Sequence, residues 1–384
     1  MGFWKSTLEN LVVLENSFGN IFKGKTIFVT GHTGFIGTWT TLWLHSLGAK
    51  VIGYSKNIPT VPSLFEILDL KNDITHVIGD VNDAKHLNDC LTKYNPEIVF
   101  HLAAQSLVKT SYDIPIETFQ TNVMGTANIL ESIRKVSSVR VCVIMTSDKC
   151  YENRELDYAY KEGEPMGGSD PYSASKGAAE LIVASYRKSF FDSKNNNDNV
   201  CISSVRAGNV IGGGDWAKNR IVPDCIQSLK NNQPIPVRNP NSSRPWQYVL
   251  EPISGILQLA TKMWNDPSDY NEAWNFGPNH KNKILVKELV SQILESWGDG
   301  KWSDISESKG EYEAGTLMVD STKAMKLLEW KPVYSLDESI SETITWYREN
   351  ENKTSDMKDF TLDQILKYVQ KAKQLNIPWA LVSQ

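Results

Sequence analysis

A hydroxyl, an acid and a base stand together where an apolar segment ends. Residues 139–144 (VRVCVI) have the pattern of a buried strand, and Ser147, Asp148 and Lys149 lie at its carboxyl end. In a cleft, these three groups can hydrogen-bond a substrate, protonate a leaving group and remove a proton. The alternative interpretation is a strand-end ion pair between Asp148 and Lys149, with the lysine orienting water or the carboxylate.

A tyrosine and a lysine four residues apart form a second set. Tyr172 and Lys176 (YSASK) project from one face of a helix that is predicted to begin near Pro171. An ammonium group near a phenol favours the phenolate, so Lys176 is expected to lower the pKa of Tyr172 and make it a base. Tyr-x-x-x-Lys is common by chance, but Ser147 precedes it and can hydrogen-bond the same substrate oxygen.

Three glycines spaced three apart follow a short apolar strand, residues 25–30 (KTIFVT), and lead into a helix. In this pattern Gly31 permits the tight turn, Gly34 lets the backbone approach a pyrophosphate, and Gly37 lets the helix pack on the strand. The helix N-terminus then faces the anion with free N–H groups. The spacing and its context predict a dinucleotide-binding loop rather than an ordinary tight turn.

The ends of the second and third predicted strands bear on which dinucleotide binds. A site for NAD usually has a carboxylate at the end of the second strand, whereas this chain has Ser55 and Lys56 there. Lys56 is either a partner for a 2′-phosphate, which would mean NADP, or a solvated surface lysine. Asp80, at the end of the third strand, either accepts a hydrogen bond from the adenine amino group or is only a turn residue at the strand end. The predicted cofactor is NAD, with NADP as the alternative.

Strand and helix patterns alternate along the first two thirds of the chain. This alternation predicts an α/β fold with a Rossmann-type, doubly wound parallel sheet. The predicted strands are 25–30, 49–54, 75–80, 96–104, 139–147 and 200–210, and the predicted helices lie near Ala84–Tyr94, Ile116–Lys135 and Tyr172–Phe191.

The composition of the sequence changes after Gly208, where glycine and proline become frequent. This change predicts a smaller C-terminal substrate-binding lobe whose long loops are functional. The predicted organisation is an N-terminal extension (1–23), a Rossmann dinucleotide-binding domain (24–206), a mainly substrate-binding lobe interleaved with the last Rossmann elements (207–349), and a C-terminal helical extension (350–384).

Composition limits the class of partner. The 384 residues carry a net charge of -5, so the sequence provides no basic face for nucleic acid. No stretch approaches the roughly 18 apolar residues of a membrane span, and the N-terminus lacks a signal-peptide pattern. The five cysteines have no paired metal-ligand spacing. We therefore expect a reduced, cytoplasmic protein with a small-molecule substrate, no metal site and no nucleic-acid or membrane partner.

Together these motifs resemble those of the extended short-chain dehydrogenases/reductases. The resemblance covers residues 24–348 and rests on TGHTGFIG, HLAA, NVMGT, the strand-end serine and YSASK. Within that superfamily the chain resembles the CDP-glucose 4,6-dehydratases. Most sugar-nucleotide dehydratases have Asp-Glu after the strand-end residue, whereas this group has Asp-Lys, as here. The motifs that carry this second resemblance are GHTGFIG, PTVPSLFE, TSDKCYEN, EPMGGSDPYSASKG, RAGNVIGGGDWA and RPWQYVLEP.

The resemblance implies a reaction. CDP-D-glucose would become CDP-4-dehydro-6-deoxy-D-glucose and water, through internal hydride transfer by a bound nicotinamide, for deoxysugar and surface-polysaccharide biosynthesis. Tyr172 would take the 4-hydroxyl proton, Asp148 would protonate the departing 6-hydroxyl, and Lys149 would handle the carbon 5 proton. The alternatives are a dehydratase or 4-epimerase for another nucleotide sugar, and a non-catalytic NAD-binding protein. An epimerase would not need the acid-base pair after Ser147.

The resemblance also implies the residues of each subsite and a homodimer or dimer of dimers, formed through 116–135 and 172–191. The catalytic set is Ser147, Asp148, Lys149, Tyr172 and Lys176. The expected cofactor contacts are Gly31, Thr33, Gly34, Phe35, Ile36, Gly37, Asp80, Val81, Leu102, Ala103, Ala104, Tyr172 and Lys176. The expected substrate contacts are Gln105, Asn209, Arg220, Arg238, Arg244 and Trp246, with two arginines, Arg244 and Arg238, as candidates for the diphosphate.

Overall fold

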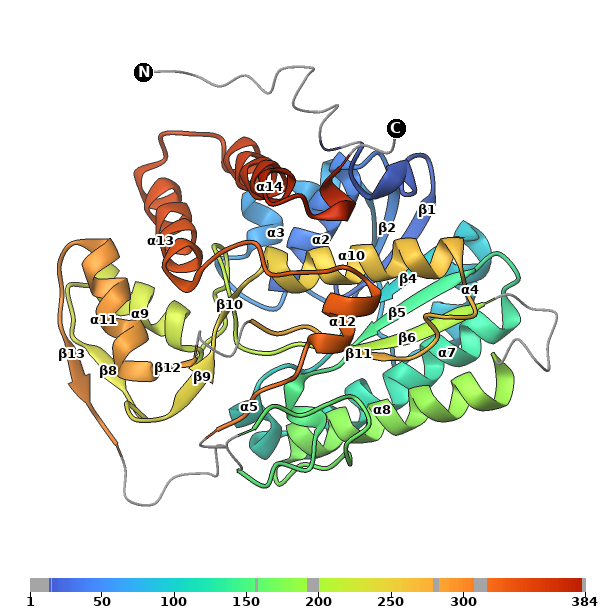
Figure 1. Ribbon diagram of the computed structural model, residues 1–384, viewed down its shortest axis with the longest axis horizontal. Helices are drawn as coiled ribbons and strands as arrows, with labels where there is room; N and C mark the ends of the chain where they lie inside the picture. Colours follow the sequence, from blue (N-terminus) through green and yellow to red (C-terminus); the bar gives the residue numbers. More distant parts are fainter. Residues whose placement is uncertain are drawn as a thin grey trace.

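A seven-stranded parallel sheet forms the centre of the computed structural model, which describes residues 14, 16–155, 158–191, 200–278, 283–306 and 316–381 (Figure 1). The strand order is β11-β6-β5-β4-β1-β2-β3, and it reverses direction between β1 and β4. This order confirms the predicted Rossmann-type, doubly wound α/β fold. The strands are β1 (Thr26–Thr30), β2 (Lys50–Ser55), β3 (Thr75–Ile78), β4 (Ile98–His101), β5 (Val141–Met145), β6 (Cys201–Arg206) and β11 (Ala273–Asn275).

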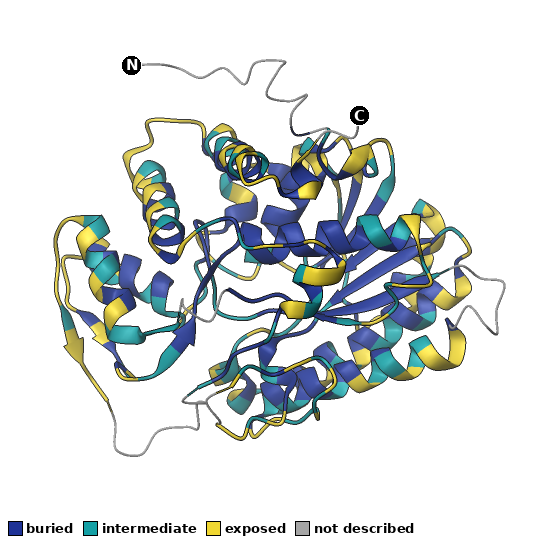
Figure 2. Cartoon of the chain, viewed as in Figure 1, coloured by how far each residue is buried: buried dark blue, intermediate teal, exposed yellow. Residues whose placement is uncertain are grey.

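Helices cover both faces of the sheet, because successive side chains of a strand point to opposite faces. In β1, Ile27 and Val29 join the core beneath α2 and α10, while Phe28 joins the core beneath α4, α7 and α8. Figure 2 shows that the sheet and the inner sides of these helices are buried. The helices are α2 (Phe35–Ser46), α3 (Leu64–Ile67), α4 (Ala84–Tyr94), α5 (Val108–Asp113), α6 (Pro115–Phe119), α7 (Gly125–Lys135), α8 (Pro171–Phe190) and α10 (Leu250–Asn265).

The predicted helices near 84–94 and 172–191 are confirmed as α4 and α8. The predicted helix near 116–135 is present in three parts, because a π-helical turn, Gln120–Met124, joins α6 to α7. No helix in the described residues is both long enough and apolar enough to cross a bilayer.

A smaller lobe lies to one side of the sheet, at the left of Figure 1. It is held by short two-stranded sheets that pair β7 with β10, β8 with β13 and β9 with β12. The chain then returns to the central sheet through β11, as expected for a lobe interleaved with the last Rossmann elements. The domain boundaries themselves stay a prediction. The elements of the lobe are β7 (Val210–Ile211), α9 (Ile221–Lys230), β8 (Ile235–Val237), β9 (Ser243–Pro245), β10 (Gln247–Tyr248), β12 (Lys283–Leu285), α11 (Val286–Trp297), β13 (Trp302–Asp304) and α13 (Leu336–Asn352), whereas α12 (Thr322–Leu327) lies beside β11.

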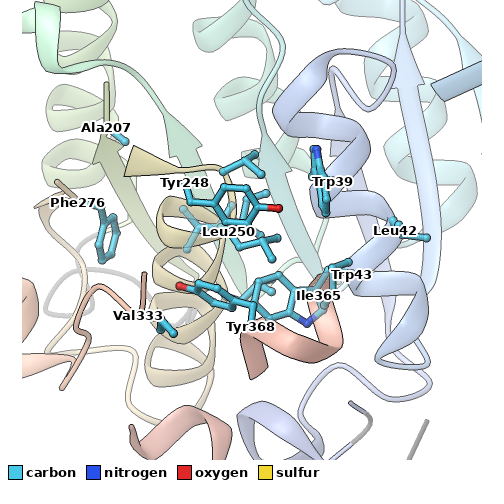
Figure 3. Close-up of a cluster of buried hydrophobic side chains, with 14 of the residues drawn as sticks. Trp39, Leu42, Trp43, Ala207, Tyr248, Leu250, Phe276, Val333, Ile365 and Tyr368 are labelled. Atoms are coloured by element: carbon cyan, nitrogen blue, oxygen red, sulfur yellow. The ribbon is translucent and has the colours of Figure 1, made fainter. Parts of the chain in front are cut away.

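The C-terminal helix α14 (Met357–Gln374) packs on the outer side of α2 as part of the main core. Figure 3 shows Trp43 and Tyr368 within one apolar cluster, and their rings meet edge to face with centroids 6.0 Å apart. Phe18, from a 3₁₀ turn near the N-terminus, stacks on Trp379 with centroids 4.9 Å apart. The described parts of both chain extensions are therefore built into the Rossmann half of the molecule.

Candidate active site

A large cleft opens at the carboxyl ends of the central strands, between the sheet and the smaller lobe. Its volume is about 1260 Å³. In doubly wound sheets, ligands bind in this crevice, where the strand order reverses. Every residue that the sequence predicted for the cofactor, the substrate or catalysis lines this one cleft.

The glycine loop at one end of the cleft has the geometry that a pyrophosphate requires. Gly31 has a φ of +75°, and a Cβ there would lie 2.7 Å from the backbone N of Ala103. A Cβ at Gly37 would lie 2.0 Å from the carbonyl oxygen of Gly31, so the helix packs directly on the loop. Gly34 precedes α2 as its N-cap and has only one neighbouring atom, at 3.4 Å. The cradle is therefore open at the helix N-terminus, where an anion is stabilised.

The chain just after β2 and β3, beside the glycine loop, carries the groups that would meet the adenosine half of a dinucleotide. Lys56 Nζ lies 2.9 Å from Asp80 Oδ2, although the lysine side chain is 71% exposed. Neither interpretation of Lys56 included this partner, which lies just after β3. Thr33 ties the loop to the end of β2, because its hydroxyl donates to the Asn57 carbonyl. The end of β2 thus carries no carboxylate of its own, and the local negative charge comes from Asp80 on the β3 side.

The segment after β4 forms the floor of the cleft. The backbone N–H groups of Leu102 and Ala103 both donate to Thr30 Oγ1, each at 3.2 Å. Gln105 lines the cleft, but its Nε2 donates to Leu107 and Thr118 and its Oε1 accepts from the Leu107 N–H. Its side-chain amide therefore holds its own loop. The remaining predicted cofactor contacts here, Val81 and Ala104, also line the cleft.

Ser147 organises the strand end that follows β5. Its Oγ accepts a hydrogen bond from the Lys149 N–H at 3.2 Å, which caps a 3₁₀ turn, Asp148–Cys150. The same hydroxyl donates to Asp148 Oδ1 at 2.9 Å. Serine and acid are both buried, whereas Lys149 is half-buried. The short turn after the strand is what places the three side chains together in the cleft.

Asp148 is held from a second side by the loop after β6. Asn209 Nδ2 donates to Asp148 Oδ2 at 3.2 Å, and the Asp148 N–H donates to the Ala207 carbonyl. A Cβ at Gly208 would lie 2.0 Å from the carboxylate, so only glycine allows this approach. Asn209 has a φ of +52°, a left-handed conformation that asparagine tolerates. The predicted substrate contact Asn209 therefore also supports the acid.

Tyr172 and Lys176 are both buried on the first turns of α8. Asp170 caps this helix by accepting from the Ser173 N–H at 2.9 Å, and Pro171 occupies its first position. Burial lowers the pKa of Lys176 to about 8. Burial raises the pKa of Tyr172 to about 12, although a hydrogen bond with Ser147 lowers it. The predicted lowering of the Tyr172 pKa is therefore wrong as a net shift, because the cost of burying a phenolate outweighs any contribution from Lys176.

A buried ion pair beneath these residues escaped sequence reasoning. Glu180 Oε2 lies 2.7 Å from Arg206 Nη2, and the same carboxylate accepts from Thr146 and Ser204. Burial alone would raise the pKa of Glu180, but Arg206 and these hydrogen bonds lower it overall. Glu180 follows Lys176 by one helical turn, a spacing that could have suggested it. The pair anchors α8 to β5 and β6 directly under the cleft.

The predicted substrate arginines differ in how far their guanidinium groups are already engaged. Arg220 donates to Asp215 Oδ2 at 3.0 Å and to Ser106 Oγ at 3.1 Å. Arg238 donates to the side chain and backbone of Asn219. Arg244 is buried at the cleft, with Nη1 donating to the Ser243 carbonyl at 2.9 Å. The indole of Trp246, the last predicted contact, also lines the cleft.

The sequence matches a family of known proteins over most of its length. The family model described as GDP-mannose 4,6 dehydratase matches residues 28–343. The chain is 47% identical to a CDP-glucose 4,6-dehydratase of Salmonella typhimurium, over 86% of this chain and 92% of that protein. It is 25% identical to a dTDP-glucose 4,6-dehydratase of Xanthomonas campestris, over 85% of this chain and 94% of that protein.

Solved structures share the fold at lower identity. A dTDP-glucose 4,6-dehydratase of Bacillus anthracis, in complex with NAD, superposes with a TM-score of 0.71 at 21% identity, covering 86% of this chain and 98% of that chain. A UDP-glucose 4-epimerase of Thermotoga maritima with UDP-glucose gives a TM-score of 0.73 at 22% identity, covering 85% and 99%. Both support the predicted fold, while the sequence matches support the predicted resemblance. The chain therefore belongs to the GDP-mannose 4,6 dehydratase family.

Proposed function

We propose that this protein is a CDP-glucose 4,6-dehydratase that uses NAD. The observation that carries the proposal is the strand end Ser147-Asp148-Lys149, which lies in the same cleft as Tyr172 and the glycine loop. The Salmonella typhimurium relative, 47% identical over 92% of its length, carries this activity in its name. The product would be CDP-4-dehydro-6-deoxy-D-glucose, a precursor for deoxysugars, and the protein would act in the cytoplasm.

The described residues fit a dinucleotide. The open glycine cradle at the N-terminus of α2 suits the pyrophosphate, and Asp80 lies where the adenosine half would reach. When bound, the nicotinamide would accept a hydride and later return it, and its oxidised ring would add a positive charge to the cleft. A nearby positive charge lowers the pKa of a phenol, which would offset the effect of burial. We favour NAD over NADP because Lys56 already pairs with Asp80.

The side chains of the cleft divide the remaining work. Tyr172 removes the proton from the 4-hydroxyl of the hexose, and the resulting ketone acidifies the proton on carbon 5. Lys149, half-buried at the strand end, removes that proton. Asp148 protonates the departing 6-hydroxyl, which leaves as water. Lys176 stabilises the phenolate of Tyr172, and Arg220, Arg238 and Arg244 hold the diphosphate.

Incubation of the purified protein with CDP-glucose tests the proposal directly. We expect formation of a 4-keto-6-deoxy sugar, which is detected by its absorbance in alkali. UDP-, dTDP- and GDP-glucose, assayed in parallel, report the preference for the base. Formation of CDP-galactose would indicate an epimerase instead, and no change in any sugar nucleotide would indicate a binding protein.

Arg244→Ala should mainly weaken substrate binding. A hydrogen bond to a charged group contributes roughly 1.5–3 kcal/mol, so KM for CDP-glucose should rise about ten- to a hundred-fold while kcat changes little. Arg244→Lys should fall between the two, because lysine keeps the charge but loses the forked contact. Arg154→Ala, at an exposed surface pair, is the matched control. An unchanged KM in Arg244→Ala would remove this residue from the substrate site.

We also propose a homodimer formed through α6, α7 and α8. Large apolar side chains are exposed on this side of the molecule although the neighbouring core is well buried. Such a patch on a soluble protein is typical of a self-complementary interface. The exposed side chains are Ile116, Phe119 and Met124 on α6 and the π-helical turn, and Leu181 and Phe190 on α8.

Leu181→Arg should convert the dimer to a monomer, because the proposed interface would then have to bury a charged arginine from each protomer. Light scattering at micromolar concentration measures the mass. Leu327→Arg is the matched control, since Leu327 is similarly exposed but lies on α12. A parent protein that is monomeric at this concentration would contradict the proposed dimer.

A further inference from the structure

A carboxylate lies among the arginines that are proposed to hold the diphosphate. Asp224, on the first turn of α9, lines the cleft together with Arg220 and Arg238. Its backbone N–H donates to the Arg220 carbonyl at 3.0 Å, and its Oδ2 lies 3.9 Å from Arg238 Nη2. Like charges placed side by side weaken binding, so a phosphate is the wrong neighbour for this side chain. The carboxylate instead suits a part of the substrate that donates hydrogen bonds.

The order of residues along the cleft indicates which part of the substrate reaches Asp224. The proposed reaction requires the hexose at Tyr172, and the diphosphate follows the hexose in the ligand. Burial raises the pKa of Tyr172, and Arg220 lies near enough for its positive charge to lower that pKa in part. Arg220 is also the N-cap of α9, and Asp224 lies one helical turn beyond it. The nucleoside, which follows the diphosphate, is therefore the part of the substrate that meets Asp224.

The carboxylate of Asp224 has unused capacity to accept hydrogen bonds. In the part of the chain that the structure describes, only the Asn219 N–H donates to it, at 3.2 Å from Oδ1. The distance of 3.9 Å to Arg238 is too long for a hydrogen bond, and Arg238 donates to Asn219 instead. Burial raises the pKa of Asp224, although Arg238 and the Asn219 N–H lower it in part. A further donor from a ligand would therefore stabilise this carboxylate.

The exocyclic groups of the bases differ in whether they can donate to a carboxylate. Cytosine carries an amino group at position 4, which donates to aspartate or glutamate. Uracil and thymine carry a carbonyl oxygen at the same position, and guanine carries one at the corresponding position. A carboxylate repels such an oxygen, and neither group then has a proton to share. One carboxylate at the nucleoside end of the cleft thus favours cytosine over these three bases.

We infer that Asp224 selects the cytosine base, by accepting a hydrogen bond from the N4 amino group of CDP-glucose. The inference rests on the proposed function and adds the residue that sets its base preference. Arg238 donates two of its five N–H groups to Asn219, which leaves others for the diphosphate. An acid in the first turn also stabilises the helix itself, but that effect is the same for every nucleotide.

Binding of CDP and UDP to the cofactor-loaded protein, measured by calorimetry, tests this selection without turnover. The two ligands share the ribose and the diphosphate, so the ratio of their dissociation constants reports on the base. The parent should bind CDP about 10- to 100-fold more tightly than UDP. Asp224→Asn should bring the two within a few-fold, because its amide can accept from N4 or donate to O4. Asp224→Ala should reach a similar ratio, mainly by weakening CDP.

Asp337→Asn is the matched control and should keep the parental ratio, because Asp337 is an exposed acid in the first turn of α13, outside the cleft. The ratio of kcat/KM for CDP-glucose and UDP-glucose should change in parallel with the binding ratio. The inference is refuted if the parent does not distinguish CDP from UDP or if both Asp224 variants keep the parental ratio. Equal weakening of both ligands would also refute it, because a ribose contact or a structural defect acts in that way.

Failure of the proposed function gives a different result. If Asp224 sets the binding ratio but no 4-keto-6-deoxy sugar forms from CDP-glucose, the selection of cytosine stands and only the dehydratase activity is refuted.

Discussion

Tyr172→Phe should lower the rate of turnover by about 10²- to 10⁴-fold while folding and cofactor binding stay intact. The substitution removes only the phenolic oxygen, and the ring remains packed at the start of α8. Without that oxygen, the 4-hydroxyl loses the base that the proposed reaction assigns to it. Because oxidation is the first step, no reduced nicotinamide should form after substrate is added.

Turnover, the absorbance of reduced nicotinamide and the cofactor dissociation constant together measure this effect. Tyr186→Phe is the matched control, because Tyr186 lies on the same helix but packs against Phe190 outside the cleft. Near-parental turnover in Tyr172→Phe would refute the assignment of Tyr172 as the base.

Asp148→Asn and Lys149→Met should fail at a later step, after oxidation has taken place. Both variants should bind cofactor and take the hydride from carbon 4, yet release water about 10²- to 10⁴-fold more slowly. Asparagine cannot protonate the leaving hydroxyl, and methionine cannot remove the carbon 5 proton. Reduced nicotinamide should therefore accumulate on the enzyme, in contrast to Tyr172→Phe.

Exchange with solvent deuterium separates the two residues. Lys149→Met should stop deuterium from entering carbon 5, whereas Asp148→Asn should retain this exchange. Lys188→Met, at the exposed end of α8, controls for the loss of a lysine. Product formation at the parental rate in both variants would mean that Asp148 and Lys149 form only a strand-end ion pair.

Local patterns in the sequence predicted the Rossmann half closely, since its elements carry their own start and stop signals. In α4, the N-cap Asp83 accepts from the His86 N–H, and Asn95 ends the helix in a left-handed conformation. The short strands of the smaller lobe lack such signals. Strand β7 has two residues and pairs with β10, which also has two. Neither is long enough to show the alternation of apolar and polar residues that predicts a strand. The π-helical turn 120–124 likewise has no local signature.

In the candidate site, too, local sequence patterns predicted some features, whereas others depend on the tertiary structure. The spacing of Tyr172 and Lys176 and the order of Ser147, Asp148 and Lys149 could be read directly from the chain. The partner of Lys56 could not, because it depends on how β2 and β3 are aligned. The direction of the Tyr172 pKa shift was missed for a similar reason, since it depends on burial, which the sequence does not give.

The stacking of Phe18 on Trp379 has a consequence for biosynthesis. These rings lie near opposite ends of the described chain, yet they share one core with Trp43 of α2. During translation the glycine loop and the first strands emerge long before Trp379 is synthesised. The apolar surface that Trp379 covers in the folded protein therefore stays exposed to solvent during that time. Contacts between such distant segments also slow folding, because a very long loop must close to form them. The last step of folding should therefore be the docking of α14 and Trp379 onto a preformed sheet, and nascent chains that lack them should be prone to aggregation.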